Sequence, residues 1–523
     1  MFRRLGGFVV RARWAAIAGA LFVVAIGATW GSGVFGHLSS GGFLDPDSES
    51  AVVRAQIATT FGPQDADIFV LYSSPTADVT DPSFATPVKA ALATAAKRSQ
   101  VSRVVDYYAT PSPALVSSNG RQTYAIVYLR AGSDDQKLAD YLAIRSDFVV
   151  HDTTVTTQIG GVRAFYQDAN TLTKSDVERA EAFSLPVLLV LLVFIFRSAV
   201  AAAAPLVIGG LAILGGFVVV RLLTEVTAVS TFAVNIITLI GLGLAIDYSL
   251  FMVSRFREEI DGGKTTADAV VATMSTAGRT VAVSGLTVTL AVAGLLIFPQ
   301  NFLRSMGYGA MAAVAVAMIA SLTVLPACLA ILGPRINALR IPWPRRGRDG
   351  DAWARLARSV MRRPWLYFVG VLIVLAVLAA PVVHIRFGGI DTRALPASAP
   401  SRVVTDTIAR DFPPTQGAPI QVLVTGDAAP VVSQIAALPS VTSAVVSESV
   451  GDSSLVTVDY RGEPTDPAAH RIVAAIRALH PAAGTTIGVT GATADLSDQL
   501  AGLGARLPWM LLFVIVVTCV LLF

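Results

Sequence analysis

The sequence predicts a polytopic α-helical membrane protein that carries two α/β domains outside the membrane. Three observations support this fold class. Of the 523 residues, 54% are hydrophobic and 15% are charged, with a mean hydropathy of +0.63, whereas soluble domains contain about 25% charged residues. The apolar residues gather into long segments, and arginines cluster at particular ends of these segments. Two long polar segments lie between them and resemble each other.

The apolar segments predict eight membrane spans. They cover residues 14–35, 183–196, 199–223, 233–254, 280–298, 305–333, 364–384 and 507–523. Each full-length segment approaches the roughly 20 apolar residues that a spanning helix requires, and 183–196 is extended backwards by the preceding helix. The first is expected to be a signal anchor, because its apolar run is longer than the core of a cleaved signal peptide.

Basic residues set the predicted orientation. They precede the first span, end two later ones and crowd the connection before span 7. These residues are Arg3, Arg4, Arg11, Arg13, Arg197, Arg255, Arg257, Arg335, Arg340, Arg345, Arg346, Arg348, Arg355, Arg358, Arg362 and Arg363. Placing all of them in the cytoplasm gives a consistent alternation of spans. Topology and anionic lipid headgroups then explain the arginines, so membrane lipids are expected as partners and nucleic acid is not.

These signals divide the chain into domains and spans of the cell inner (plasma) membrane. The parts are the first transmembrane helix at 1–35, an extracytoplasmic domain at 36–182, spans 2–6 at 183–333, a basic cytoplasmic loop at 334–363, span 7 at 364–384, a second extracytoplasmic domain at 385–506 and the start of span 8 at 507–523. A cytoplasmic amphipathic helix is expected at about 262–279. It could lie on the membrane surface, although an elbow that aims the next span is our preferred interpretation.

The two outer segments form an internal repeat. Gly41-Gly42 is echoed by Gly388-Gly389, and Phe61 recurs as Phe412, 351 residues later. A span followed by an outer domain, repeated at this distance, is typical of transporters built from parallel repeats.

Each outer segment also shows the same order of predicted elements, β-α-β-β-α-β, which is ferredoxin-like. In the first domain the strands are expected at 67–73, 101–107, 122–130 and 154–160, and the helices at 84–98 and 134–149. In the second domain the strands are expected at 419–425, 441–448, 453–460 and 484–490, and the helices at 429–437 and 465–479.

The second repeat stops within its second span. We expect the chain to be an expressed fragment, a truncated gene product or half of a split transporter, in which spans 9–12 come from a separate C-terminal half. A homo-oligomer is the alternative partner.

One ionisable residue, Asp247, lies well inside a predicted span, with Tyr248 beside it. A carboxylate there costs roughly 2.5 kcal/mol to insert, and such groups usually face a bundle interior and belong to an ion or proton path. Asp247 precedes Arg255 by eight residues, about 12 Å along a helix, so its short side chain does not reach the cytoplasmic edge. Gly241 and Gly243 could allow a close helix approach or be ordinary packing glycines.

Four stretches resemble the MmpL (mycobacterial membrane protein large) family of the RND superfamily of proton-driven exporters. They are Gly241-Leu-Gly-Leu-Ala-Ile-Asp247-Tyr248-Ser-Leu-Phe251, Ala277-Gly-Arg-Thr-Val-Ala-Val-Ser284-Gly, Leu322-Thr-Val-Leu-Pro326-Ala and Gly41-Gly42-Phe43. The resemblance implies two outer porter domains above two six-span bundles, with an Asp-Tyr pair in the fourth and tenth spans. It also implies that Asp247 and Tyr248 form the proton relay and pair with their counterparts across the interface between the two bundles. Ser284 is expected near them, and a hydrogen bond from its hydroxyl to the backbone alone is the alternative role.

The expected function is therefore proton-motive-force-driven export of lipids or other hydrophobic molecules to the cell envelope. The alternatives are an RND-type protein-export helper and a lipid- or sterol-sensing scaffold that transports nothing. No enzyme activity, metal or cofactor is expected apart from the proton gradient, because phosphate-binding and zinc-binding motifs are missing from the sequence. The sequence assigns no residue to substrate binding.

Overall fold

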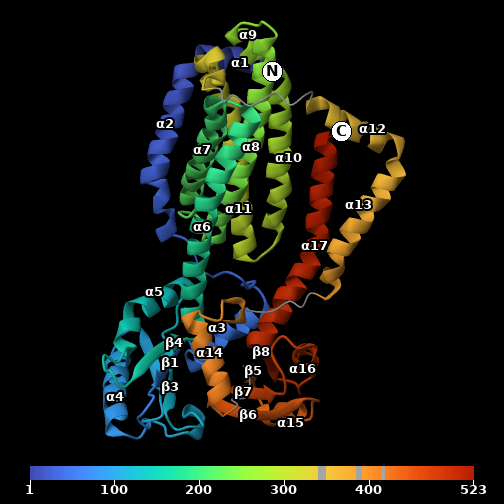
Figure 1. The fold of residues 1–523 in the computed structure, drawn as a ribbon. Coiled ribbons are helices and arrows are strands. Elements are labelled where there is room, and N and C mark those ends of the chain that lie inside the picture. The colour runs from blue at the N-terminus through green and yellow to red at the C-terminus, as the bar shows by residue number, and fades with distance from the viewer. Residues whose placement is uncertain (40, 340–348, 385–391, 414–418, 523) are drawn as a thin grey trace.

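The computed structural model describes residues 1–39, 41–339, 349–384, 392–413 and 419–522. A long helical bundle occupies one end of the molecule and two β-sheets occupy the other (Figure 1). The arginines at 340, 345, 346 and 348 and the repeated Gly388-Gly389 motif lie outside the described residues.

Within the described residues, eight helical segments are long and apolar enough to cross a membrane, and they match the eight predicted spans. They contain α2 (Arg13–Thr29), α6 (Val162–Phe196), α7 (Ala199–Leu223), α8 (Phe232–Asp261), α10 (Arg279–Ala293), α11 (Asn301–Leu332), α13 (Pro364–Ala379) and α17 (Ala492–Leu522). Helices α7, α8 and α11 form the centre of the bundle. Helix α17 packs on α10, whereas α13 has no buried residue and stands apart from the bundle (Figure 1).

Three short helices lie at the end of the bundle opposite the sheets (Figure 1): α1 (Phe2–Arg11), α9 (Thr266–Thr273) and α12 (Asp349–Arg362). Helix α9 begins at Thr265, whose hydroxyl accepts a hydrogen bond from the Asp268 amide, as a helix N-cap does. It continues through a π-helical turn at Met274–Gly278 into α10.

The segment at 262–279 packs as the preferred elbow interpretation expects, rather than as a helix that lies on the membrane surface. Its apolar face consists of Val270, Met274, Ala277 and Val281, and all four side chains are buried in the bundle core. Gly6 of α1 lies so close to Met274 that an added methyl group would be 3.2 Å from the Met274 Cβ. The segment is therefore an elbow that leads into the next span and is covered by α1.

Each outer segment folds into a four-stranded antiparallel sheet with the predicted order of elements. The first sheet has the order β2-β3-β1-β4, and the second has the order β6-β7-β5-β8. The first contains β1 (Ile68–Ser73), α4 (Pro82–Ala96), β2 (Val101–Val105), β3 (Gln122–Leu129), α5 (Asp134–Ile144) and β4 (Thr156–Gly160). The second contains β5 (Ile420–Thr425), α15 (Ala428–Ala436), β6 (Val441–Val450), β7 (Ser453–Tyr460), α16 (Pro467–Arg477) and β8 (Thr486–Thr490).

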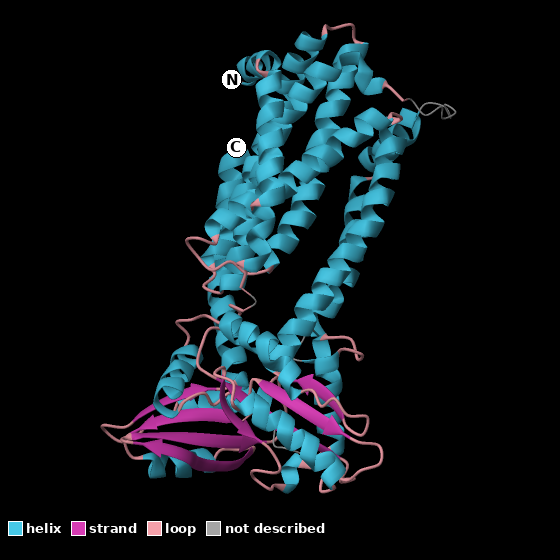
Figure 2. Cartoon of the chain, turned by 90° about the vertical axis from the view of Figure 1, so that its left-hand side faces the viewer, coloured by secondary structure: helices cyan, strands magenta, loops and turns pink. Residues whose placement is uncertain are grey.

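The two repeats exchange one helix each. Helix α3 (Glu49–Phe61) belongs to the first repeat but packs on β8 of the second sheet, whereas α14 (Pro400–Asp411) belongs to the second repeat and packs on β4 of the first. Val53 of α3 is buried with Leu423 and Leu455. Each exchanged helix covers the face of a sheet that would otherwise expose apolar side chains, so the two sheets lie side by side as one unit (Figure 2).

Candidate functional site

Asp247 lies in the middle of α8, on a face of the helix that the described residues leave uncovered. Leu239, Gly243, Asp247 and Phe251 follow one another at intervals of four residues and are all exposed. Because residues four apart share one face of a helix, they form a continuous stripe along α8. The sequence favoured a position facing the bundle interior. The side chain instead points away from the core formed with α7 and α11.

Tyr248, unlike Asp247, lies inside the bundle. It is 5% exposed and packs in the same apolar core as Ala245 and Met252. Its hydroxyl lies close to that of Ser284 on α10, but the two do not form a hydrogen bond of good geometry. The structure thus brings Asp247, Tyr248 and Ser284 into one region, with the carboxyl and Ser284 exposed and the phenol buried.

Two buried hydroxyl groups follow Asp247 directly in the sequence, those of Tyr248 and Ser249. Among the described residues, neither the Tyr248 hydroxyl nor the Ser249 hydroxyl has a hydrogen-bond partner. By contrast, Thr287 and Thr289 on α10 donate to the backbone carbonyl four residues earlier, which is how hydroxyls in membrane helices are usually satisfied. An unsatisfied buried polar group costs about 1–3 kcal/mol. We therefore expect water or a further protein group to form hydrogen bonds with these two hydroxyls.

The two glycines before Asp247 have different surroundings. A methyl group added to Gly241 would lie 3.3 Å from the Ala313 Cβ and 3.9 Å from the Ala212 Cβ, so Gly241 allows α8 to approach α11 and α7 closely. Gly243 has no atom within 4 Å of the corresponding position, and it lies on the same open stripe as Asp247. Only Gly241 packs against another described helix.

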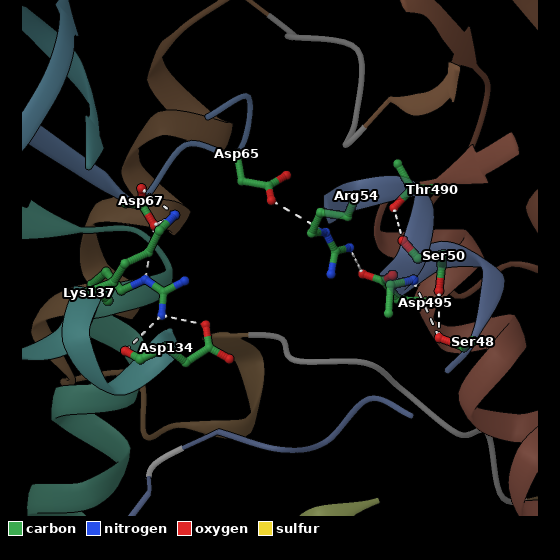
Figure 3. Close-up of polar contacts among 11 residues, drawn as sticks. Ser48, Ser50, Arg54, Asp65, Asp67, Asp134, Lys137, Thr490 and Asp495 are labelled. Carbon is green, nitrogen blue, oxygen red and sulfur yellow. Dashed lines mark hydrogen bonds and ion pairs between the residues drawn. The ribbon is translucent and has the colours of Figure 1, made fainter. Parts of the chain in front are cut away.

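A second polar cluster anchors α6 to the first sheet, and the sequence did not reveal it. Asp67, 1% exposed, precedes β1 and accepts hydrogen bonds from Lys137 at 3.1 Å, Arg163 at 3.0 Å and the Leu129 amide at 2.9 Å. Arg163 in the first turn of α6 also pairs with Asp134 at 2.9 Å (Figure 3). A buried carboxylate of this kind needs such partners. In the sequence Asp67 resembles an ordinary loop aspartate.

A third polar cluster ties the exchanged helix α3 to α17. Arg54 pairs with Asp495 and, at 3.4 Å, with Asp65 (Figure 3). Burial alone would lower the pKa of Arg54, but the carboxylates of Asp495 and Asp65 outweigh it and raise that pKa above its usual value. Helix α3 follows the first span, and α17 contains the eighth span. The ion pair between Arg54 and Asp495 therefore links these two spans at a point outside the bundle.

The same junction holds further contacts. The Ser50 amide donates to Asp498 at 3.0 Å, and the Thr490 hydroxyl donates to the Ser50 carbonyl at 2.8 Å. Beside them, a groove of about 380 Å³ opens between α3 and the second sheet. Its lining is mixed, with Glu49 and Gln56 beside Val52 and Ile487.

Comparison with known proteins gives the family. The family model described as "MMPL family" matches residues 42–367. The membrane protein SCO6666 of Streptomyces coelicolor is 35% identical over a region covering 94% of this chain and 69% of that protein. The trehalose monomycolate exporter MmpL3 of Mycobacterium tuberculosis is 30% identical, covering 100% of this chain and 61% of that protein. The mycolic acid-containing lipids exporter MmpL11 of Mycolicibacterium smegmatis is 31% identical, covering 99% and 56%.

This chain therefore spans less than two thirds of the length of the two named exporters. The Asp247 and Ser284 stretches fall inside the matched region, as do Gly42 and Phe43. MmpL3 and MmpL11 are named as exporters and not as enzymes. With eight helices able to cross a membrane and a family match over more than half of its residues, the chain is a multi-pass membrane protein that belongs to the MMPL family.

Proposed function

We propose that this chain belongs to a proton-motive-force-driven exporter of lipids or other hydrophobic molecules in the inner (plasma) membrane. The names of the relatives MmpL3 and MmpL11 support the class of cargo. The observation on which the energy source rests is Asp247, an ionisable side chain on an open face in the middle of a spanning helix. In this proposal the two sheets with their exchanged helices are extracytoplasmic, ferredoxin-like porter domains.

In the relay that we propose, the Asp247 carboxyl takes up a proton from one aqueous compartment and releases it to the other. Each proton that crosses supplies about 2.3 kcal/mol per 100 mV of membrane potential. Tyr248 can donate a hydrogen bond from its free hydroxyl to the ionised carboxylate. The Ser284 hydroxyl can accept a hydrogen bond from Tyr248 or donate one in turn.

The open stripe on α8 supports a further part of the proposal. A carboxylate left against lipid costs about 2.5 kcal/mol or more, so protein or water is expected to cover this face in the membrane. A second bundle of the same transporter, or a second copy of this chain, would cover it. Gly243 would then allow the close approach that Gly241 already provides within the first bundle.

The decisive experiment is the substitution Asp247→Asn in the chromosomal gene, with lipid export to the cell surface as the readout. The transport proposal predicts that export is lost while the amount and thermal stability of the protein are unchanged, because the side chain makes no packing contact in the core. Asp261→Asn is the matched control: Asp261 is exposed at the end of the same helix and should tolerate the change.

The outcome also separates the alternatives. Export that persists in Asp247→Asn would favour a lipid-sensing scaffold over a proton-driven pump. Loss of the protein itself would mean that Asp247 has a structural role. Infrared difference spectra of the purified protein should further show a carboxyl band that titrates with pH and is missing from Asp247→Asn.

A further inference from the structure

The motif Gly41-Gly42-Phe43 lies where the first outer domain meets the bundle. The Phe43 ring is in contact with three other aromatic rings. Its centroid lies 5.2 Å from that of Phe302 and 5.9 Å from that of Phe232, and it stacks on Tyr166 at 6.4 Å. Phe232 is the first residue of α8, Phe302 lies in the first turn of α11, and Tyr166 lies in the second turn of α6. One side chain therefore contacts the outer domain and two central helices of the bundle.

Backbone hydrogen bonds hold the same segment against the bundle. The Ser39 amide donates to the Val229 carbonyl at 2.8 Å, and the Thr231 amide donates to the Ser39 carbonyl at 3.0 Å. The Phe302 amide donates to the Gly42 carbonyl at 3.2 Å. These bonds attach the segment to the starts of both α8 and α11.

The two glycines fit the segment into this junction. Gly42 has a φ of +88°, a conformation that disfavours other residues, and an added methyl group would lie 2.8 Å from the Asn301 Cβ. A methyl group on Gly41 would lie 2.7 Å from a carboxylate oxygen of Asp134. Asp134 in turn pairs with Arg163, which is bonded to Asp67 at the start of β1 (Figure 3). The segment is thus enclosed between Asn301 of the bundle and Asp134, which is tied to the first sheet.

We propose that Phe43 is the positioning residue that couples movement of α8 to the first outer domain. The inference rests on the proposed function, because α8 is the helix that carries Asp247. Fifteen residues separate Phe232 from Asp247 in this one helix, about 22 Å. A shift of α8 on protonation reaches Phe232 as a rigid-body movement, and Phe43 passes it to Tyr166.

The aromatic contacts of Phe43 can transmit movement because their geometry is defined. Aromatic pairs prefer defined edge-to-face or offset geometries and are worth about 0.5–1.5 kcal/mol each beyond the burial of their surface. The covalent route is less direct, because α6, which continues from the first sheet into the membrane, packs on α7 in the bundle. Removal of the Phe43 ring would leave both bodies folded but would remove the aromatic contacts that join them at this junction.

Two distances measured by spin labelling test the proposal in the full chain. Cys328 and Cys519 are first replaced by serine. One label pair, at Glu258 and Arg335, reports on the bundle, and the other, at Glu258 and Lys97, reports on the outer domain relative to the bundle; all three sites are exposed. Asp247→Asn imitates the protonated carboxyl. It is expected to change both distances by about 2 Å or more.

Adding Phe43→Ala should abolish the change at Lys97 and leave the change within the bundle. Phe43→Leu, which keeps an apolar side chain at the junction, should restore part of the Lys97 response and guards against a misfolded alanine variant. Phe35→Ala is the matched control, because Phe35 makes an aromatic contact with Phe217 at 5.6 Å that involves only the membrane part. It should leave both responses intact.

Two results would contradict the inference in different ways. If Asp247→Asn still changes the distance between Glu258 and Lys97 in the Phe43→Ala protein, the outer domain follows α8 by another route. The proposed proton relay would then be unaffected, but the coupling through Phe43 would be disproved. If Asp247→Asn changes neither distance, the relay itself fails, and the coupling fails with it.

Discussion

Val53 and Val404 lie 351 residues apart in the sequence and occupy equivalent positions, each packed on a glycine of the other repeat's sheet. Val53 lies against Gly488 in β8, and Val404 lies against Gly160 in β4. The serines that precede them are equivalent as well. The Ser50 amide donates to Asp498, and the Ser401 amide donates to Asp168 at 2.8 Å. The repeat read from the sequence is therefore an exchange of helices in three dimensions.

A disulfide can test this exchange. The Val53 Cβ lies 3.5 Å from a Cβ placed on Gly488, inside the range of about 3.5–4.5 Å found in disulfides. In a background without Cys328 and Cys519, the double variant Val53→Cys/Gly488→Cys should form an intramolecular disulfide on mild oxidation. Mass spectrometry of the non-reduced digest would detect the linked peptides.

The matched control is Val53→Cys/Gly160→Cys, which pairs α3 with the sheet of its own repeat. It should remain reduced, because α14 occupies that position. A disulfide in the control and none in the first variant would mean that the helices are not exchanged.

The sequence predicted the elements of both sheets well because alternating and helical patterns are local. It could not predict the exchange. Two similar sheets offer α3 two similar apolar faces, and no pattern within α3 distinguishes them. Hydropathy is limited in a related way, because it marks Asp247 as lying in a span but does not give the direction in which its side chain points.

The two glycines of the Asp247 stripe should differ in their effect on stability. Gly241→Val inserts methyl groups between α8 and α11, where even a Cβ added to Gly241 would lie 3.3 Å from the Ala313 Cβ. The change should destabilise the bundle by about 1–3 kcal/mol. Gly243→Val adds the same atoms in open space and should leave the midpoint of thermal unfolding in detergent unchanged. Equal losses from the two variants would contradict the described packing. A Gly243→Val protein that is stable but inactive in export would support contact between this stripe and another bundle.

Asp67 should be essential to the first outer domain, whereas its neighbour Asp65 should not. Asp67→Asn leaves Lys137 and the buried Arg163 without their shared carboxylate, and breaking a buried ion pair costs about 3–5 kcal/mol. Hydrogen exchange should therefore accelerate in β1 and in the first turns of α6. Asp65→Asn is the control, because the Asp65 side chain is 53% exposed and surface pairs contribute about 1 kcal/mol or less. Similar exchange rates in the two variants would mean that the cluster does not anchor α6.

Acidification should destabilise the second outer domain through His470. This side chain is half-buried in α16, and its Nδ1 lies 2.6 Å from the Ser497 hydroxyl. Burial lowers the pKa of His470 below its usual value of 6.5. The unfolded chain therefore binds a proton at a higher pH than the folded chain does, so stability is retained above pH 6.5 and falls as the pH drops toward the folded pKa.

The measurement is the midpoint of thermal unfolding between about pH 7.5 and pH 5.5, a window in which histidine titrates and most carboxylates do not. His470→Asn should flatten the decline at the acidic end, because asparagine can keep a hydrogen bond to Ser497 without titrating. His480→Asn is the control, since His480 is exposed in the same domain and meets water in the folded and unfolded chain alike. An unchanged slope in His470→Asn would assign the acid sensitivity to another group.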